Sequence, residues 1–377
     1  MIERKSNSHI YRAALILICS LTAATTAAQQ KKSGLVPAGG PFKVLSATTE
    51  YIFEQGPFKS VHASTVVELP NGNIAAAWFG GDHEGASDVC IWMSIRDEKK
   101  GWSRPLRIAD GVQPDYKTQY PCWNPVLFRV GKKLYLHYKV GPNPREWWAL
   151  YRFSDDNGHS WSTPEPMPEG FLGPIKNKPL QLWDGTILYP SSTESIDEKH
   201  WNIHIEGSDP GMQDWWWVEI PCGDFQVIQP TLMEVGPSGR GVRQRPIRLL
   251  ARSKHNVLFE SWSHDDGRTW SSVRPTNIPN PNSGVDAVSW GERQLLVYNP
   301  LPAGKAWWEG RSILKLAVLT HDKAEDIYTF EDHPMGEYSY PAIIVGSQGI
   351  VHITYTDVRS RIKYVRMEVG VPVSVAK

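Results

Sequence analysis

The chain is poor in cysteine and has no net charge, and these two features exclude several classes of protein. Only four of its 377 residues are cysteines, and no Cys/His spacing typical of a zinc site is present. Cys90, Cys122 and Cys222 lie beyond the N-terminal segment, so they form either one disulfide at most or three buried free thiols. Forty basic residues balance forty acidic ones without a long run of either sign, which excludes a nucleic-acid-binding surface. We expect no cofactor, no metal, no nucleic-acid partner and a monomer.

Long apolar runs are also absent, and the one short run lies in an N-terminal targeting segment. Basic residues precede the apolar run 13–21, and small residues follow it up to Ala28. This run is too short to span a membrane. We therefore predict a signal peptide over residues 1–28, cleavage after Ala28, and a secreted or periplasmic mature chain without a membrane span. Residues 29–41 are rich in Lys, Gly and Pro and predict a disordered linker.

A short motif occurs twice. Residues 154–161 and 263–270 both read S-x-D-x-G-x-[S/T]-W. In each copy the Asp can accept hydrogen bonds from turn amides, and the Gly permits a positive φ. The Trp at the end can hold the turn against a sheet. The two copies therefore predict two hairpin turns of the same kind.

Polar or glycine-containing turns recur roughly every 55 residues between apolar strands, a period typical of repeat architectures. The six turns are Asn71-Gly72, Gly131-Lys132, Asp184-Gly185, Ser238-Gly239, Gly291-Glu292 and Gln348-Gly349. No stretch shows a sustained helical period. The pattern predicts an all-β fold, a six-bladed β-propeller of four-stranded antiparallel blades in one domain over residues 42–372. The last blade should close with a strand from residues 42–55 or from the C-terminal tail, and five or seven blades are the alternative counts.

The repeated motif resembles the Asp-box of sialidase-like (neuraminidase superfamily) BNR-repeat propellers, and the resemblance covers nearly all of residues 45–368. It implies a retaining exo-glycosidase that resembles exo-α-sialidases, with its site at the mouth of the central channel. Members of that family use a tyrosine as the nucleophile. The Asp-boxes themselves are expected at hairpin tips, away from the channel.

Near the N-terminus of the predicted domain, the resemblance implies one change and one match. An arginine heads the first inner strand in that family and binds the sialic acid carboxylate, whereas His62 has that spacing here. A neutral imidazole cannot make a guanidinium's two-pronged contact with a carboxylate, so His62 is a candidate base, a hydroxyl ligand or a structural histidine. Asp82, on a glycine-rich loop, matches the acid/base Asp, and Glu84 is the second candidate there. Calcium binding or turn formation is the other explanation for this loop.

The middle of the chain carries candidate substrate contacts. Lys176 and Lys178 lie on a Pro/Gly-bounded segment and can supply positive charge to an acidic sugar, although solvated loop lysines are an equal explanation. Glu194 ends a run that reads as an inner strand and is a candidate carboxylate.

The resemblance implies the remaining site residues. Gln229 has the place of the Glu that partners the nucleophile in that family. Arg252 matches the second carboxylate-binding arginine, and Arg311 matches the third. Tyr338 matches the nucleophile, since a neutral phenol is not repelled by a sugar carboxylate. Plain strand packing is the alternative for Tyr338.

These residues predict a glycosidase that hydrolyses a terminal acidic sugar from a glycan, its expected partner. Two alternatives remain open. In a uronate-polysaccharide lyase, Arg and Lys would neutralise the uronate while His62 or Tyr338 removes the C5 proton. In a non-catalytic glycan-binding propeller, Asp82 would be dispensable.

Overall fold

The structure is a computed structural model that describes residues 42–237, 244–306 and 308–371. All regular secondary structure in these residues is β-strand, and no helix among them is long and apolar enough to cross a membrane. The predicted signal peptide (1–28), the predicted linker (29–41) and the predicted turn at Ser238-Gly239 lie outside the described residues.

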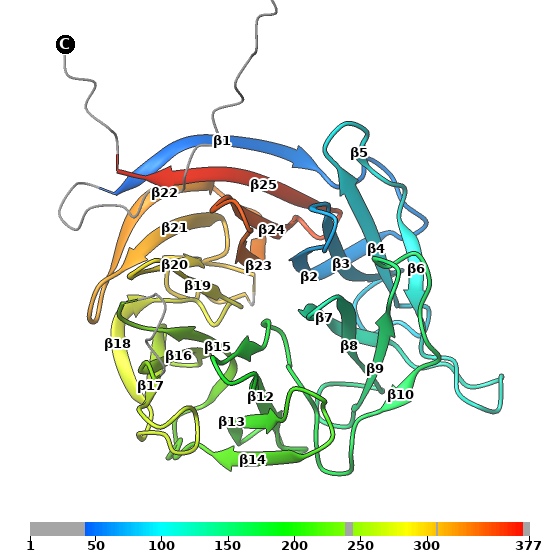
Figure 1. Cartoon of the computed structure of the whole chain (residues 1–377), viewed down its shortest axis with the longest axis horizontal. Coiled ribbons are helices and arrows are strands. Elements are labelled where there is room, and N and C mark those ends of the chain that lie inside the picture. Colours follow the sequence, from blue (N-terminus) through cyan, green and yellow to red (C-terminus); the bar gives the residue numbers. More distant parts are fainter. Residues whose placement is uncertain (1–41, 238–243, 307, 372–377) are drawn as a thin grey trace, which may run out of the picture. The chain divides into compact units, whose positions relative to one another are not determined.

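Six antiparallel sheets follow one another around a common axis, as Figure 1 shows. The first two blades consist of β2 (Ser60–Glu68), β3 (Ile74–Gly81), β4 (Cys90–Asp97), β5 (Gly101–Trp102) with the additional β6 (Leu106–Ala109), and β7 (Cys122–Val130), β8 (Lys133–Val140), β9 (Trp148–Ser154), β10 (Glu165–Pro166). The third and fourth consist of β11 (Leu180–Gln181), β12 (Ile187–Glu194), β13 (Trp201–Ser208), β14 (Trp215–Glu219), and β15 (Val227–Glu234), β16 (Ile247–Ser253), β17 (Val257–Ser263), β18 (Arg274–Pro279). The last two consist of β19 (Asp286–Trp290), β20 (Arg293–Tyr298), β21 (Ile313–Leu319), β22 (Ala324–Asp332), and β23 (Tyr338–Val345), β24 (Val351–Asp357), β25 (Arg361–Gly370), β1 (Lys43–Tyr51). The six-bladed propeller predicted from the turn spacing is confirmed.

The last blade takes its outer strand from the opposite end of the chain. Strand β1 pairs antiparallel with β25, from Lys43 opposite Gly370 to Tyr51 opposite Lys363. Of the two closures expected, the one from residues 42–55 is therefore observed. It joins the first strand to the last and closes the ring.

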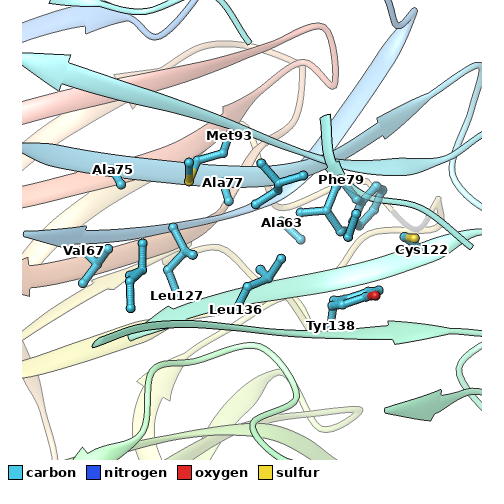
Figure 2. Close-up of a cluster of buried hydrophobic side chains, with 14 of the residues drawn as sticks. Ala63, Val67, Ala75, Ala77, Phe79, Met93, Cys122, Leu127, Leu136 and Tyr138 are labelled. Carbon is cyan, nitrogen blue, oxygen red and sulfur yellow. The ribbon is translucent and has the colours of Figure 1, made fainter. Parts of the chain in front are cut away.

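The hydrophobic core is divided among the interfaces between neighbouring blades. Six buried clusters are present, one at each interface. Figure 2 shows the cluster between the first two blades, where Ala75 and Ala77 of β3 face Leu127 of β7 and Leu136 of β8. Because both faces of a blade are covered, β3 and β16 are buried along their whole length, and β3 reads as a continuous apolar run rather than an alternating one.

Both Asp-boxes form the turn between the third and outer strands of a blade, away from the inner strands. Asp265 accepts hydrogen bonds from the Thr269 amide at 2.8 Å and from the Thr269 hydroxyl at 2.6 Å. Gly267 has a φ of 82°, which its lack of a side chain permits. Trp270 donates to the Gly267 carbonyl at 3.0 Å and packs into the core between the third and fourth blades. The chemistry expected of the motif is thus confirmed.

Four of the inner strands carry a β-bulge near their first residues. The pairing register with the next strand shifts in β2, β7, β15 and β23. In each of these strands, the residue directly after the last pair before the shift has a positive φ. These residues are Ala63, Asn124, Gln229 and Tyr340. A non-glycine residue in this conformation costs roughly 1 kcal/mol or more, so such positions tend to cluster where function requires them. The bulges redirect side chains at one end of the channel.

The Asp-box turn should contribute to stability through its tryptophan. We expect Trp270→Ala to reduce the free energy of unfolding by about 3–5 kcal/mol, because it leaves a cavity in a packed interface. Denaturant unfolding measures this loss. The matched control is Trp217→Ala on the outer strand β14, where the side chain is 58% exposed and the change should stay within about 0.5 kcal/mol. Equal losses in the two variants would contradict the role given to Trp270.

Candidate functional site

Three arginines meet at the channel end where the bulged inner strands begin. Arg252 lies near the end of β16, Arg311 precedes β21, and Arg359 lies in the turn between β24 and β25. Nη1 of Arg252 and Nη2 of Arg311 both donate to the Asn282 carbonyl, each at 3.2 Å. Sequence elements far apart in the chain therefore place two guanidinium groups against one oxygen.

Glu337 connects the third arginine to this pair. Its carboxylate accepts hydrogen bonds from Arg311 Nη1 at 2.8 Å, from Arg359 Nε at 2.7 Å and from Ser339 Oγ at 2.8 Å. Burial alone would raise the pKa of Glu337, but the hydrogen bond and charge of Arg359 and the charge of Arg311 outweigh it and lower the pKa. Glu337 is therefore an ionised counter-charge in the arginine cluster.

Sequence reasoning missed Arg359 and Tyr340. Arg359 lies in a tight turn with a φ of 56°, and its carbonyl accepts a hydrogen bond from the Val61 amide at 2.8 Å, which attaches the turn to β2. Its charge is favoured despite burial because Glu84 and Glu337 face it, and together they raise its pKa. In the sequence, Arg359 is one arginine of a short polar turn. Such a residue is common at hairpin tips, so it did not indicate a functional site.

Tyr340 occupies the centre of the cluster. Its hydroxyl oxygen accepts a hydrogen bond from Arg252 Nη1 at 2.8 Å. Three cationic groups surround its ring: Arg252 Cζ lies 5.5 Å, Arg311 Cζ 5.9 Å and Lys176 Nζ 5.8 Å from the ring centroid. The phenol is 8% exposed, so it is held in one position at the channel end.

Tyr338, the residue matched to the nucleophile, lies elsewhere. Its ring stacks on His333 at 4.5 Å and packs in the core between the fifth and sixth blades. Tyr338 contacts Arg311 only through its backbone amide, which donates to the Arg311 carbonyl at 2.9 Å. The side chain of Tyr340, and not that of Tyr338, lies against the guanidinium groups, because the bulge between Ser339 and Ala342 turns it to another face of the strand.

His62 is part of the cluster as a neutral group. Its ring centroid lies 4.1 Å from that of Tyr340, and its Nδ1 lies 2.9 Å from Thr356 Oγ1. Burial, followed by the charges of Arg359, Arg311, Arg252 and Lys176, holds the pKa of His62 well below its ordinary value. Arg359 Nη2 is 3.5 Å from Nε2, an orientation that makes this nitrogen the acceptor and Nδ1 the donor.

The glycine-rich loop places one of its two candidate carboxylates in the cluster. Glu84 forms an ion pair with Arg359. Asp82 instead pairs with Lys59 and with His83, and its side chain is 45% exposed. Hydrogen bonds from Lys59 and His83 lower the pKa of Asp82, so it stays ionised rather than holding a proton for donation.

The two predicted lysines lie deeper, between blades. Lys176 Nζ donates to Asn177 Oδ1 at 2.9 Å, to the Val285 carbonyl at 3.0 Å and to the Pro341 carbonyl at 2.5 Å. Burial lowers the pKa of Lys176 to about 7. Lys178 pairs with the buried Asp286, whose carboxylate also accepts from the Thr231 hydroxyl at 2.7 Å. Lys176 therefore contacts the cluster, whereas Lys178 connects its segment of the third blade to β19 of the fifth blade.

Gln229 and Glu194 lie on the third- and fourth-blade side of the cluster. The backbone amide of Gln229 donates a hydrogen bond to Ser192 Oγ at 3.2 Å, and its backbone carbonyl accepts one from the side-chain amide of Asn177. Glu194 ends β12 and is half-buried, and burial raises its pKa even though Arg252 opposes the rise.

The cysteines take no part in this site, and the described residues form no cluster of metal ligands. Cys90, Cys122 and Cys222 are buried free thiols, which is one of the two states expected for them. In residues 42–237, 244–306 and 308–371, no three His, Cys, Asp or Glu side chains gather as metal ligands do.

Comparison with known proteins agrees with the fold described above. The family model of the BNR repeat-like domain matches residues 72–353. The chain belongs to the BNR repeat-like family. No curated protein sequence matches it significantly.

Solved structures of sialidases and of one protein of unknown function share the fold of this BNR repeat-like chain. The NanB sialidase of Streptococcus pneumoniae has a TM-score of 0.65 at 14% identity, over 85% of this chain and 70% of that one. A leech intramolecular trans-sialidase has a TM-score of 0.64 at 15% identity, over 86% and 70%. A protein of unknown function from Dyadobacter fermentans has a TM-score of 0.67 at 14% identity, over 88% and 99%. The predicted sialidase-like BNR-repeat propeller is confirmed.

Several buried polar atoms at the site of this BNR repeat-like chain are unsatisfied, and two of them lie on residues predicted from the sequence. Arg252 Nε and Gln229 Oε1 have no hydrogen-bond partner in the described part of the chain, although Arg252 is 8% and Gln229 5% exposed. Leaving such atoms unpaired is costly, and native proteins do so rarely. One is a donor and the other an acceptor, so a bound molecule that offers both an anionic oxygen and a hydroxyl would complete them.

The cluster should depend on its internal counter-charge. We expect Glu337→Gln to reduce the free energy of unfolding at pH 7 by about 3 kcal/mol, because it leaves the buried Arg311 and the half-buried Arg359 without their carboxylate. A carboxylate with a lowered pKa stabilises above its unfolded pKa, and this contribution is lost as pH falls through the folded value. The difference from wild type should therefore shrink below about pH 4. Denaturant unfolding at both pH values measures it.

The control for this measurement is Glu325→Gln, an exposed carboxylate on the outer strand β22, which should leave stability unchanged at both pH values. A Glu337→Gln variant as stable as wild type at pH 7 would show that Glu337 does not neutralise the arginines.

Proposed function

We propose that this protein is a glycoside hydrolase that removes a terminal acidic sugar from a glycan. The observation that carries the proposal is the convergence of Arg252 and Arg311 on the Tyr340 phenol, with Arg359 joined to Arg311 through Glu337. Guanidinium groups suit a sugar carboxylate because they offer paired donors and a permanent charge. The sialidases that share the fold support the reaction class by analogy.

Arg252 is the best-placed ligand for the carboxylate. Arg311 and Arg359 are already paired with Glu337, whereas the guanidinium of Arg252 donates to the neutral Tyr340 hydroxyl and Asn282 carbonyl. Its unsatisfied Nε gives it a further donor for an anion. An acidic sugar on Arg252 would lie directly against the tyrosine.

Tyr340 would act as the nucleophile in place of the residue matched from the sequence. Its oxygen accepts the Arg252 hydrogen bond, an arrangement that favours negative charge on that oxygen. His62 packs against the ring and, as a neutral group, adds no charge beside it. Gln229 would present its free Oε1 to a sugar hydroxyl.

The predicted export of the chain agrees with this role. A signal peptide over residues 1–28 would deliver the enzyme to a compartment where glycan chains are encountered. The processed chain would begin at Gln29, which N-terminal sequencing of the exported protein tests.

Hydrolysis of fluorogenic glycosides tests the proposal. We expect the wild type to release 4-methylumbelliferone from a glycoside of N-acetylneuraminic acid or of D-glucuronic acid, and not from one of D-galactose, which lacks the carboxylate. Tyr340→Phe should lower kcat/KM by about 1,000-fold or more, because it removes the attacking oxygen. Tyr338→Phe is the matched control and should change kcat/KM less than about threefold, because that hydroxyl has no contact with the cluster.

Two results would count against this function. Wild-type activity that survives in Tyr340→Phe would remove the tyrosine from the mechanism. An unsaturated product absorbing in the ultraviolet, released from a uronate polysaccharide, would instead make the protein a lyase.

A further inference from the structure

Glu194 is an ionisable residue at the site whose carboxylate makes no hydrogen bond and no ion pair within the residues that the structure describes. It ends β12 at the same end of the channel as the arginines, opposite Trp201 of β13. Most other carboxylates around the site have partners: Asp82 pairs with Lys59, Glu84 with Arg359, and Glu337 with two arginines. Glu194 is therefore the acidic side chain there that can hold and release a proton without breaking an ion pair.

The direction of the Glu194 side chain follows from strand geometry. Residues two apart in a strand point to the same face, so Glu194 shares its face with Ser192. Ser192 Oγ accepts a hydrogen bond from the backbone amide of Gln229, in the fourth blade, at 3.2 Å. This contact shows that the face of β12 carrying Ser192 points toward the fourth blade. Glu194 thus faces the fourth blade, where Arg252 pairs in register with Ile228, the residue before Gln229.

The charged groups facing Glu194 are few and mostly occupied. They are Arg252, Arg145, Lys254 and Glu198, from the three segments packed around it. Arg145 pairs with Glu198, and Lys254 donates to the Glu198 carbonyl at 3.3 Å while covering the Trp201 ring at 4.0 Å. Burial dominates over these charges and raises the pKa of Glu194, the shift that a proton donor near neutral pH requires.

We propose that Glu194 is the general acid that protonates the glycosidic oxygen, in place of Asp82. This inference rests on the proposed function, and it adds the residue that completes the reaction. Arg252 couples the two residues, since its guanidinium donates to Tyr340 and its charge acts on the Glu194 carboxylate.

The reaction balances with these two groups. Tyr340 enters the reaction as its phenolate, after the phenol proton has been lost to water. The phenolate oxygen bonds to the anomeric carbon, the glycosidic C–O bond breaks, and the leaving oxygen takes its electron pair and the proton of Glu194. In the second step the Glu194 carboxylate takes a proton from water, the water oxygen bonds to the anomeric carbon, and the electron pair of the tyrosyl bond returns to the phenolate. The sum is hydrolysis with retention, and both residues end as they began.

Dependence on the leaving group tests this role. The wild type, Glu194→Gln and Asp82→Asn are compared on the 4-methylumbelliferyl and the methyl glycoside of the acidic sugar that the wild type hydrolyses. A methyl glycoside needs protonation to leave, whereas 4-methylumbelliferone leaves readily without it. We expect Glu194→Gln to lose about 100-fold or more in kcat on the methyl glycoside and less than about tenfold on the other. The alkaline limb of its kcat/KM profile should also disappear.

Asp82→Asn is the matched control, and we expect both rates to stay within about threefold of wild type. Thermal unfolding checks that Glu194→Gln folds, as expected for a side chain without a hydrogen bond to lose. If Glu194→Gln slows both substrates equally or not at all, or if Asp82→Asn shows the leaving-group dependence, the inference is wrong while the proposed function stands. A wild type inactive on every acidic glycoside overturns the proposed function and this inference together.

Discussion

The structure depends on apolar packing between neighbouring blades. A single four-stranded sheet here has two apolar faces, and β3 and β16 are buried along their entire length. Such a sheet cannot cover both faces by itself, so each blade needs two neighbours and the row of blades must close into a ring. Six clusters fill the six interfaces. Polar side chains are then left to gather along the central channel and on the loops at its ends.

This constraint explains why the charges at the site are so strongly coupled. Arg252, Arg311 and Arg359 come from three different blades, yet the ring brings them to one place, where burial makes unpaired charge costly. Glu337 offsets two of the three. Arg252 is left with a phenol and a carbonyl, so in the described residues two guanidinium groups of the cluster have a carboxylate partner and one has only neutral acceptors.

The sequence was sufficient for the fold because its signals are local. An Asp-box or a Gly-containing hairpin turn is recognisable within eight residues, and the spacing of such turns counts the blades. Arg252 and Arg311 were also predicted, from the resemblance to the family's carboxylate-binding arginines, and the structure places both in the cluster. Tyr340 was not, because residues two apart in a regular strand point the same way and only the bulge separates Tyr340 from Tyr338. The place of Arg359 in the cluster depends on contacts between blades, and the pairing of Asp82 depends on contacts between separate segments. Neither can be predicted from a short stretch of sequence.

The pairing of β1 with β25 also determines the order in which the molecule can assemble. On a ribosome β1 emerges first, and its partner strand is the last to appear. Strand β1, the outer strand of the sixth blade, therefore has no partner until β25 has been made, and closing so long a loop is slow. Until then the chain is an open row of blades with an apolar face exposed at each end. A propeller with this strand order closes only once β25 has been made, and the pairing of β1 with β25 holds the finished ring together.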